Sequence, residues 1–510
     1  NMGGLKPDGA VFHHAGHYPA YAIGGFEGLT SFLMAVRNSG LSIEEPAKAS
    51  LAKALTAMKQ YTHTYDWTIG LSGRHPHAGA MTAEVLERAQ LLGLITDTNP
   101  QRFFVMNHAA LGVYRTGSAL VTLKGYNSDV WGSEIYTADN RYGRYQSHGA
   151  VEILNAGDPV SRAASRFAEN GWDWNKLPGT TAVQLPLSLL ESPQTSTLMA
   201  RSPERFAGAS SLLGQFGVFG MKLHEQNDIN NTNYTSDFKA RKSVFATGKR
   251  LICLGTGIQT ARAHYPVETT LFQQVILSPS DRVSLNGSFT SAEGFLHDAV
   301  ASGVVVVSDM TGNQYRVAGG NRLVVEGKLQ HSRHNKTKAE NSGNFLSARI
   351  HHGIAPAQGS YEYMVMLKPT PVESRRWTTA PAYRVVRADN IAHAVVDSVS
   401  DVTAWVCFDE VTVADGLLRK ADTETLLMYR PVADRIVMSV TDPALHLPEK
   451  TKNSEPTYVP GTAVFKTIEL RGNWELPVAD DRVAVEHLSA ATRLTVKCRL
   501  GDTVEFTLQP

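Results

Sequence analysis

The chain has 510 residues, which is too many for one compact core and predicts two or three domains. Its net charge is +1, so the chain as a whole exerts no strong pull on a polyanion, which argues against a general nucleic-acid coat protein. Three well-separated cysteines exclude a disulfide framework, and there is no run of 18 apolar residues that would predict a membrane span. Any binding of an acidic partner must therefore come from local clusters of Arg, Lys and His.

The first hundred residues predict helices. Apolar residues in 29–36 recur at i, i+3, i+4 and i+7, which predicts one apolar stripe on a helix, with Gly40 as its C-cap. Residues 42–45, Ser-Ile-Glu-Glu, have the capping-box pattern and predict the start of a second helix. A third helix is predicted to begin near Thr82. Helical hairpins of this kind are the unit of α/α bundles and toroids.

After residue 100 the pattern changes to short runs rich in Val, Ile, Thr and Tyr, separated by Gly, Asn, Asp and Pro. Such runs predict stacked antiparallel sheets. The clearest are Leu120–Lys124, Val304–Ser308, Arg322–Glu326, Tyr361–Leu367 and Arg435–Val440. Residues 328–344 contain few apolar residues and predict a long surface loop. The predicted organisation is a helical region at 1–98, a central antiparallel β-sandwich at 99–382 and a C-terminal β domain at 383–510.

Residues 12–21 are unusually dense in titratable rings. His13 and His17 have the i, i+4 spacing of helical metal ligands, but an intervening glycine and a following proline oppose a regular helix, and no HExxH glutamate is present. A polar loop of hydrogen-bonded rings is a second interpretation. We favour a third, in which His14 and Tyr21 form an acid/base pair.

Two further segments combine charges with rings or with turn residues. Residues 71–77 place Arg74 and two histidines in a Gly- and Pro-punctuated loop, for which a solvated loop is the simpler interpretation when it is taken alone. Residues 127–148 mix aromatic and charged residues, which suits sugar stacking and bidentate anion binding, although cross-strand aromatic pairs explain them nearly as well. No pair of acids stands out for a glycosidase.

Taken together, these segments resemble a known family. Gly9–Tyr21, Gly73–Pro76 and Val130–Gly149 occur in the order and at the spacing of chondroitin ABC lyases of polysaccharide lyase family 8. The runs Trp-Gly-Ser-Glu-Ile-Tyr at 131–136 and Asp-Asn-Arg-Tyr-Gly-Arg-Tyr-Gln-Ser-His-Gly at 139–149 are especially similar. The resemblance extends from about residue 5 to the C-terminus. It implies an α+β multidomain fold, with a partial α/α toroid, then an antiparallel β super-sandwich and a small C-terminal β domain.

The resemblance also implies a set of site residues. Catalytic roles fall on His14, Tyr21, Arg74 and Glu134. Substrate-binding roles are expected for His13, His75, Trp131, Asn140, Arg141 and Arg144. His13 stands where the compared enzymes often have arginine, which weakens any inference about how that position reads substrate charge. No metal site and no required cofactor are implied, although assistance by a divalent cation, Ca²⁺ or Mg²⁺, stays open.

The implied reaction is β-elimination at a uronic acid of chondroitin or dermatan sulfate, with hyaluronan as a further candidate. The uronate C5 hydrogen becomes removable once the neighbouring carboxylate is neutralised. A tyrosine has an ordinary pKa of about 10, and a nearby arginine such as Arg74 would favour the phenolate of Tyr21. His14 titrates near neutrality and can serve as a second base, while Glu134 orients Arg74 or His14.

The expected partners follow from the same resemblance. The substrate is an acidic polysaccharide, and no nucleic acid or membrane span is expected. The family's toroid has helices upstream of the matched segments, so we expect these helices to be missing from the given residues and to be supplied by preceding sequence or by a separate chain. A secreted or periplasmic bacterial location is expected from the extracellular polymer. The alternatives are a non-catalytic glycosaminoglycan-binding protein and a lyase specific for hyaluronan.

Overall fold

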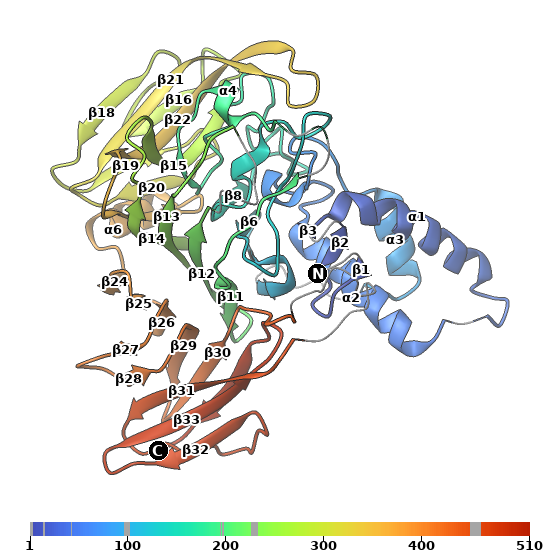
Figure 1. The fold of residues 1–510 in the computed structure, drawn as a ribbon, viewed down its shortest axis with the longest axis vertical. Helices are drawn as coiled ribbons and strands as arrows, with labels where there is room; N and C mark the ends of the chain where they lie inside the picture. The colour runs from blue at the N-terminus through green and yellow to red at the C-terminus, as the bar shows by residue number, and fades with distance from the viewer. Residues whose placement is uncertain are drawn as a thin grey trace.

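The structure is a computed structural model that describes residues 4–13, 16–41, 43–95, 102–193, 195, 198–225, 233–448 and 461–510. The chain is mostly β-sheet with few helices, and Figure 1 shows the N-terminal helices to one side of the stacked sheets. The α-helices of the described residues are α1 Pro19–Val36, α2 Glu45–Tyr61, α3 Ala83–Leu91, α4 Leu187–Leu190 and α6 Pro371–Thr379. The 3-10 helices are η1 Ile69–Leu71, η2 Asn107–Ala109 and η3 Gly143–Tyr145.

The three predicted N-terminal helices are present, with two corrections. Helix α3 follows Thr82 as its N-cap, as predicted. Helix α2 begins at Glu45 with Glu44 as its N-cap, two residues after the helix start predicted at Ser42, and Ser42 itself lies outside the described residues. Helix α1 has Arg37 as its C-cap, so the C-cap predicted at Gly40 is wrong. The predicted apolar stripe on α1 is partly uncovered, because Leu29 is 37% and Phe32 56% exposed. One face of α1 is therefore apolar and uncovered in the described residues.

Three small antiparallel sheets lie next to these helices. In the sheet β1-β2-β3, the middle strand from the ring-rich N-terminal segment pairs antiparallel with both of its neighbours. Its strands are β1 Gly4–Leu5, β2 Val11–His13 and β3 Gly16–His17. The sheet β4-β5-β6-β8 comprises β4 Arg102–Met106, β5 Leu111–Thr116, β6 Ala119–Lys124 and β8 Ala150–Leu154. A two-stranded sheet pairs β7 Glu134–Ile135 with β10 Leu198–Met199.

Two large antiparallel sheets form the middle of the molecule. The nine-stranded sheet has the order β11 Ala207–Leu212, β12 Phe216–His224, β13 Lys239–Thr247, β14 Arg250–Gln259, β23 Gly359–Met366, β20 Gln314–Val317, β19 Val305–Ser308, β16 Arg282–Leu285 and β17 Ser288–Ser291. The five-stranded sheet has the order β18 Leu296–Val300, β21 Arg322–Arg333, β22 Glu340–Ile354, β15 Pro266–Val275 and β9 Thr181–Val183. Residues 328–344 thus belong mainly to a long hairpin, and the predicted surface loop is wrong.

Two more antiparallel sheets form the C-terminal part. The six-stranded sheet has the order β24 Tyr383–Ala388, β25 Ala392–Asp397, β26 Val402–Cys407, β29 Thr425–Val432, β30 Arg435–Thr441 and β34 Val504–Leu508. The five-stranded sheet has the order β27 Val411–Thr412, β28 Leu418–Ala421, β31 Val464–Arg471, β33 Ala491–Cys498 and β32 Val483–His487. The domain boundaries at 98/99 and 382/383 stay predictions, and the first lies outside the described residues.

Apolar packing joins these layers. One buried cluster runs from the helices through the four-stranded sheet into the facing sides of the two large sheets, and includes Leu55, Leu123, Cys253 and Leu346. A second cluster fills the space between the two C-terminal sheets, and a third lies between the nine-stranded and six-stranded sheets. None of the described helices is both long and apolar enough to cross a membrane.

Candidate active site

Arg74 is the centre of a polar cluster that gathers side chains from distant segments. Its Nη1 lies 3.2 Å from Glu134 Oε1, and its Nη2 donates a short hydrogen bond to the hydroxyl of Tyr21. Its Nε lies 3.4 Å from Asp139 Oδ2. The structure therefore brings together Tyr21 from α1, Arg74 from the loop after η1, and Glu134 from β7, which are three of the four side chains predicted to be catalytic.

The loop that carries Arg74 is held from beneath by a buried carboxylate. Glu152 on β8 accepts hydrogen bonds from the backbone nitrogens of Ile69 and Gly70, at 2.8 and 2.7 Å. The next turn passes through Gly73, which has φ +62, and a Cβ there would come within 2.5 Å of the Tyr18 ring. A glycine is therefore required for the close approach of this ring to the loop.

Glu134 is positioned by a neighbouring amide. The Asn140 side chain donates to the Glu134 backbone carbonyl at 2.8 Å and to the Gly73 carbonyl at 3.5 Å. Gln146 contributes to the same arrangement, since its amide also donates to the Gly73 carbonyl, at 3.2 Å. Asn140 contacts both segments, and it also donates to Gln146 Oε1 at 2.6 Å, so the two linked amides hold the Arg74 loop next to strand β7.

Tyr21 stands at the open side of the cluster. Its ring is 44% exposed and stacks on His13 with the ring centroids 4.0 Å apart. Tyr18 meets the Tyr21 ring edge-on at 4.6 Å, and the Arg74 guanidinium lies 4.9 Å from the Tyr21 ring centroid. A phenol that is exposed on one side and hydrogen-bonded to a guanidinium on the other is in a position to exchange a proton with a ligand.

Burial and neighbouring charges shift the acidities in the cluster. Burial raises the pKa of the Tyr18 hydroxyl, although Arg74 opposes the shift. Burial lowers the pKa of His75, while Asp139, 3.3 Å from its Nδ1, partly offsets this effect. For Arg74, burial alone would lower the pKa, but Tyr18, Glu134 and other neighbours raise it. Arg74 is therefore a permanent cation, and His75 is biased toward its neutral form.

Several expected substrate-binding residues have other positions. Asn140 is fully buried and Arg144 is 5% exposed, and Arg144 pairs with Glu225 at 3.1 Å, so both have structural contacts in place of the expected substrate contacts. Arg141 pairs with Glu191 at 2.7 Å, with 14% of its side chain exposed. Trp131 is half-buried under the guanidinium of Arg201, which lies 3.7 Å from its ring centroid. His13 and His75 do lie beside Tyr21 and Arg74. His14 falls outside the described residues.

Asp139 and Tyr18 are among the residues that contact Arg74 without having been selected from the sequence. Asp139 lies inside the run 139–149 that carries the family resemblance, so this signal was available but was not used. The ring of Tyr18, 5.7 Å from the Arg74 guanidinium, lies in the ring-rich segment. Neither has a spacing that would distinguish it from its neighbours, because the contact depends on how the loops meet.

A cavity of about 550 Å³ opens beside Tyr21, between α1, α2 and the strands β1 and β2. Its polar end contains His13, Tyr18 and Tyr21, and the remainder is lined mainly by apolar side chains such as Phe26 and Leu51. Across the described ranges, no group of three or more His, Cys, Asp or Glu side chains is placed to hold a metal ion. In particular, His13 and His17 lie on neighbouring strands, not on a helix.

Comparison with known proteins places this arrangement in a family. Residues 101–375 match the description "Polysaccharide lyase family 8, super-sandwich domain", and residues 1–101 match "Lyase, catalytic". The first match covers more than half of the chain. The chain belongs to polysaccharide lyase family 8. This family assignment agrees with the resemblance seen in the sequence.

Individual relatives resemble the chain along nearly its whole length. It is 29% identical to a chondroitin sulfate ABC endolyase of Proteus vulgaris, over 99% of this chain and 52% of the relative. It is 28% identical to a chondroitin sulfate ABC exolyase of Bacteroides thetaiotaomicron, over 99% of this chain and 56% of the relative. A xanthan lyase from Paenibacillus has a similar fold, with a TM-score of 0.76 and 17% identity over 99% of this chain and 52% of that chain. The chain thus spans about half the length of these relatives.

Proposed function

We propose that this protein is a glycosaminoglycan lyase that cleaves chondroitin or dermatan sulfate by β-elimination at a uronic acid. The observation that carries the proposal is the joint contact of Arg74 with the Tyr21 hydroxyl and the Glu134 carboxylate. Two curated relatives along 99% of the chain bear the name of chondroitin sulfate ABC lyases, which favours this substrate class over xanthan. Hyaluronan is the second candidate substrate.

In the proposed reaction, a base removes the uronate C5 proton and the electron pair forms a double bond to C4. The C4–oxygen bond breaks, and a proton passes to the departing glycosidic oxygen. Tyr21, held by Arg74, is the proposed proton-transfer group at the open side of the cluster, and Glu134 orients Arg74. The role of His14 as second base is a sequence-based prediction.

We propose further that additional helices of an α/α toroid cover the apolar face of α1. Leu29 and Phe32 are exposed there, and the cavity beside Tyr21 continues along the same helix. Contiguous exposed apolar surface of this kind marks a packing or interaction site. Such helices would also form the second wall of the substrate cleft. A secreted or periplasmic location is proposed because the polymer is extracellular.

Ultraviolet absorbance tests the proposal, because β-elimination creates a 4,5-unsaturated uronate that hydrolysis does not. The chain is incubated with chondroitin sulfate, dermatan sulfate, hyaluronan and heparin, each with a chelator and with added Ca²⁺ or Mg²⁺. We expect absorbance to rise with the first two polymers. A rise with hyaluronan alone would indicate the narrower lyase. Polymer binding without any rise would indicate a non-catalytic binding protein and contradict the proposal.

A further inference from the structure

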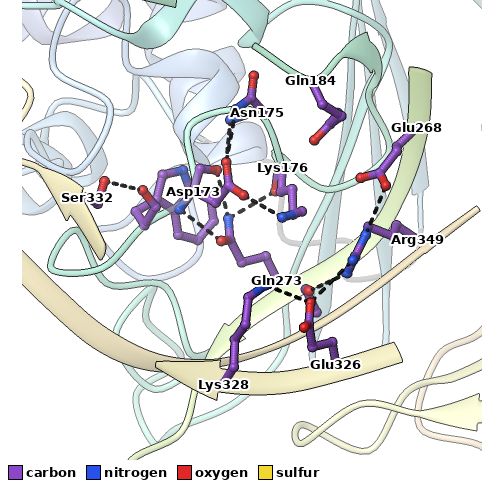
Figure 2. A network of polar contacts seen from close by, with 12 residues as sticks. Asp173, Asn175, Lys176, Gln184, Glu268, Gln273, Glu326, Lys328, Ser332 and Arg349 are labelled. Atoms are coloured by element: carbon purple, nitrogen blue, oxygen red, sulfur yellow. Dashed lines mark hydrogen bonds and ion pairs between the residues drawn. The ribbon is translucent and has the colours of Figure 1, made fainter. Parts of the chain in front are cut away.

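The turn at residues 334–339, between β21 and β22, reaches the candidate active site from a distant part of the sequence. The two strands pair continuously from Arg322 opposite His351 to Arg333 opposite Glu340. Figure 2 shows the polar network that fastens this hairpin to its neighbours. In that network, Arg349 Nε lies 3.1 Å from Glu268 Oε1 on β15. The turn is therefore carried on a well-supported hairpin.

Asn335 anchors the turn to the segment that carries Asp139 through buried hydrogen bonds. The residue is 3% exposed, and its backbone nitrogen donates to Glu169 Oε1 at 2.9 Å. Its side-chain oxygen accepts from the Tyr142 nitrogen at 2.8 Å, and its amide donates to Asn140 Oδ1 at 2.8 Å. These three hydrogen bonds fix the backbone immediately before Lys336.

Lys336 extends from this anchored position toward the Arg74 cluster. Its Nζ lies 3.6 Å from Asp139 Oδ1, and 62% of its side chain is exposed. Asp139 has other partners, with Arg74 Nε at 3.4 Å and His75 Nδ1 at 3.3 Å. An ion pair to so exposed a lysine is weak, so Lys336 can leave Asp139 without leaving that carboxylate unpaired.

We propose that Lys336 is the cation of an anion-binding subsite, which receives a negatively charged group of the sugar chain next to the uronate held at Arg74. The inference rests on the proposed function. An ammonium is a compact point charge that binds a sulfate ester or a carboxylate without a fixed fork geometry. Because Asn335 already orders the turn, little backbone freedom is lost when the ligand binds.

Lys338 provides a matched control in the same turn. Its Nζ pairs with a different carboxylate, Glu191 Oε2, at 2.9 Å, and Arg141 also pairs with Glu191, at 2.7 Å. Lys336→Gln and Lys338→Gln remove the same charge from two positions of one turn, separated by a single residue. We expect Lys336→Gln to raise KM for chondroitin sulfate roughly fivefold to tenfold with kcat nearly unchanged, the size of one solvated charge contact. Lys338→Gln should behave as the unaltered chain.

Comparison of chondroitin sulfate with unsulfated chondroitin identifies the bound group. A rise in KM of Lys336→Gln confined to the sulfated polymer would support a sulfate ligand. An equal rise in KM on both polymers would support a uronate carboxylate. The inference is overturned if Lys336→Gln matches the unaltered chain on both polymers, if kcat falls while KM does not, or if Lys338→Gln has the same effect. If the unaltered chain forms no product, the proposed function fails. Affinity electrophoresis in chondroitin sulfate gels then compares how strongly the polymer retards the same variants.

Discussion

Two clusters of similar composition involve opposite ends of the segment 134–148, the first through Glu134 and the second through Arg144 and His148. In the first, Arg74 pairs with Glu134 at 3.2 Å, beside Tyr21, which is 44% exposed. In the second, Arg144 pairs with Glu225 at 3.1 Å, and both side chains are at most 5% exposed. The two ion pairs differ little in length. They differ in access, because only the first has a side open to a ligand.

The environment of the second cluster explains why it is structural. Burial lowers the pKa of His148 to about 4, although Glu225 lies only 3.6 Å away and opposes the shift. Burial alone would raise the pKa of Glu225, but Arg144 and His148 lower it overall, so the carboxylate stays ionised. A charged pair enclosed in this way supports the fold and reaches no substrate. The presence of Arg, Glu, His and Tyr is therefore insufficient evidence for catalysis.

The largest expected effect is on kcat, and it is measured by removing one tyrosine hydroxyl from each cluster. Tyr21→Phe removes the hydroxyl hydrogen-bonded to Arg74 and should lower kcat on chondroitin sulfate roughly 10³- to 10⁴-fold, because it removes the proposed proton-transfer group. Tyr145→Phe removes a buried hydroxyl that donates to the Val183 carbonyl at 2.8 Å. It should leave kcat nearly unchanged and cost about 1–2 kcal/mol of stability. Absorbance kinetics and thermal unfolding measure both.

If both substitutions changed kcat by the same factor, the distinction between an open, catalytic cluster and an enclosed, structural one would be wrong. Retention of most activity by Tyr21→Phe would contradict its proposed role. A large loss of activity in correctly folded Tyr145→Phe would show that the enclosed cluster takes part in the reaction.

The second prediction tests the enclosed ion pair directly. Arg144→Met leaves the Glu225 carboxylate buried without its cation, which should destabilise the protein by about 3–5 kcal/mol. The urea midpoint of the transition that involves the central sheets should fall, while the molecules that stay folded keep their kcat. Adding Glu225→Gln removes the uncompensated charge and should restore part of the loss. An unchanged midpoint in Arg144→Met would contradict the structural role.

The sequence predicted the order of helices and sheets well, because periodicity is a local property. Thr82 does precede a helix, and runs such as Leu120–Lys124 and Arg435–Val440 lie in strands. Burial was less predictable. The periodic apolar residues of α1 include Phe32, which is 56% exposed, since periodicity shows that a helix has an apolar face but not what covers it.

The failures near the site have a common cause in tertiary contacts. Residues 328–344 looked like a loop because they are polar, yet backbone pairing with neighbouring strands makes them a hairpin that buries Gln330 and Ser332. Because the whole segment was interpreted as a surface loop, Lys336 was not selected as a candidate site residue. Tyr21, Arg74 and Glu134 were selected through resemblance to a family, not through spacing, since the sequence separation between them says nothing about how loops meet. Burial of Asn140 could not be predicted for the same reason.

The smallest expected effect concerns Glu152, a buried carboxylate that supports the open cluster through η1. Burial raises its pKa from 4.5 to about 7, against the opposing hydrogen bonds from the Gly70 and Ile69 nitrogens. The folded state then holds this proton more tightly than the unfolded state, so its contribution to stability is greatest below pH 4.5 and falls as pH rises to 7, by roughly 3 kcal/mol at most.

Glu152→Gln removes this pH dependence of stability. Urea unfolding at pH 5 and pH 8 should therefore show the free energy of unfolding shifting in favour of the variant at the higher pH. A difference that is constant with pH, or that shifts in favour of the unaltered chain, would contradict the assignment. In that case the two backbone hydrogen bonds would outweigh desolvation, and Glu152 would hold the Arg74 loop as a permanent anion.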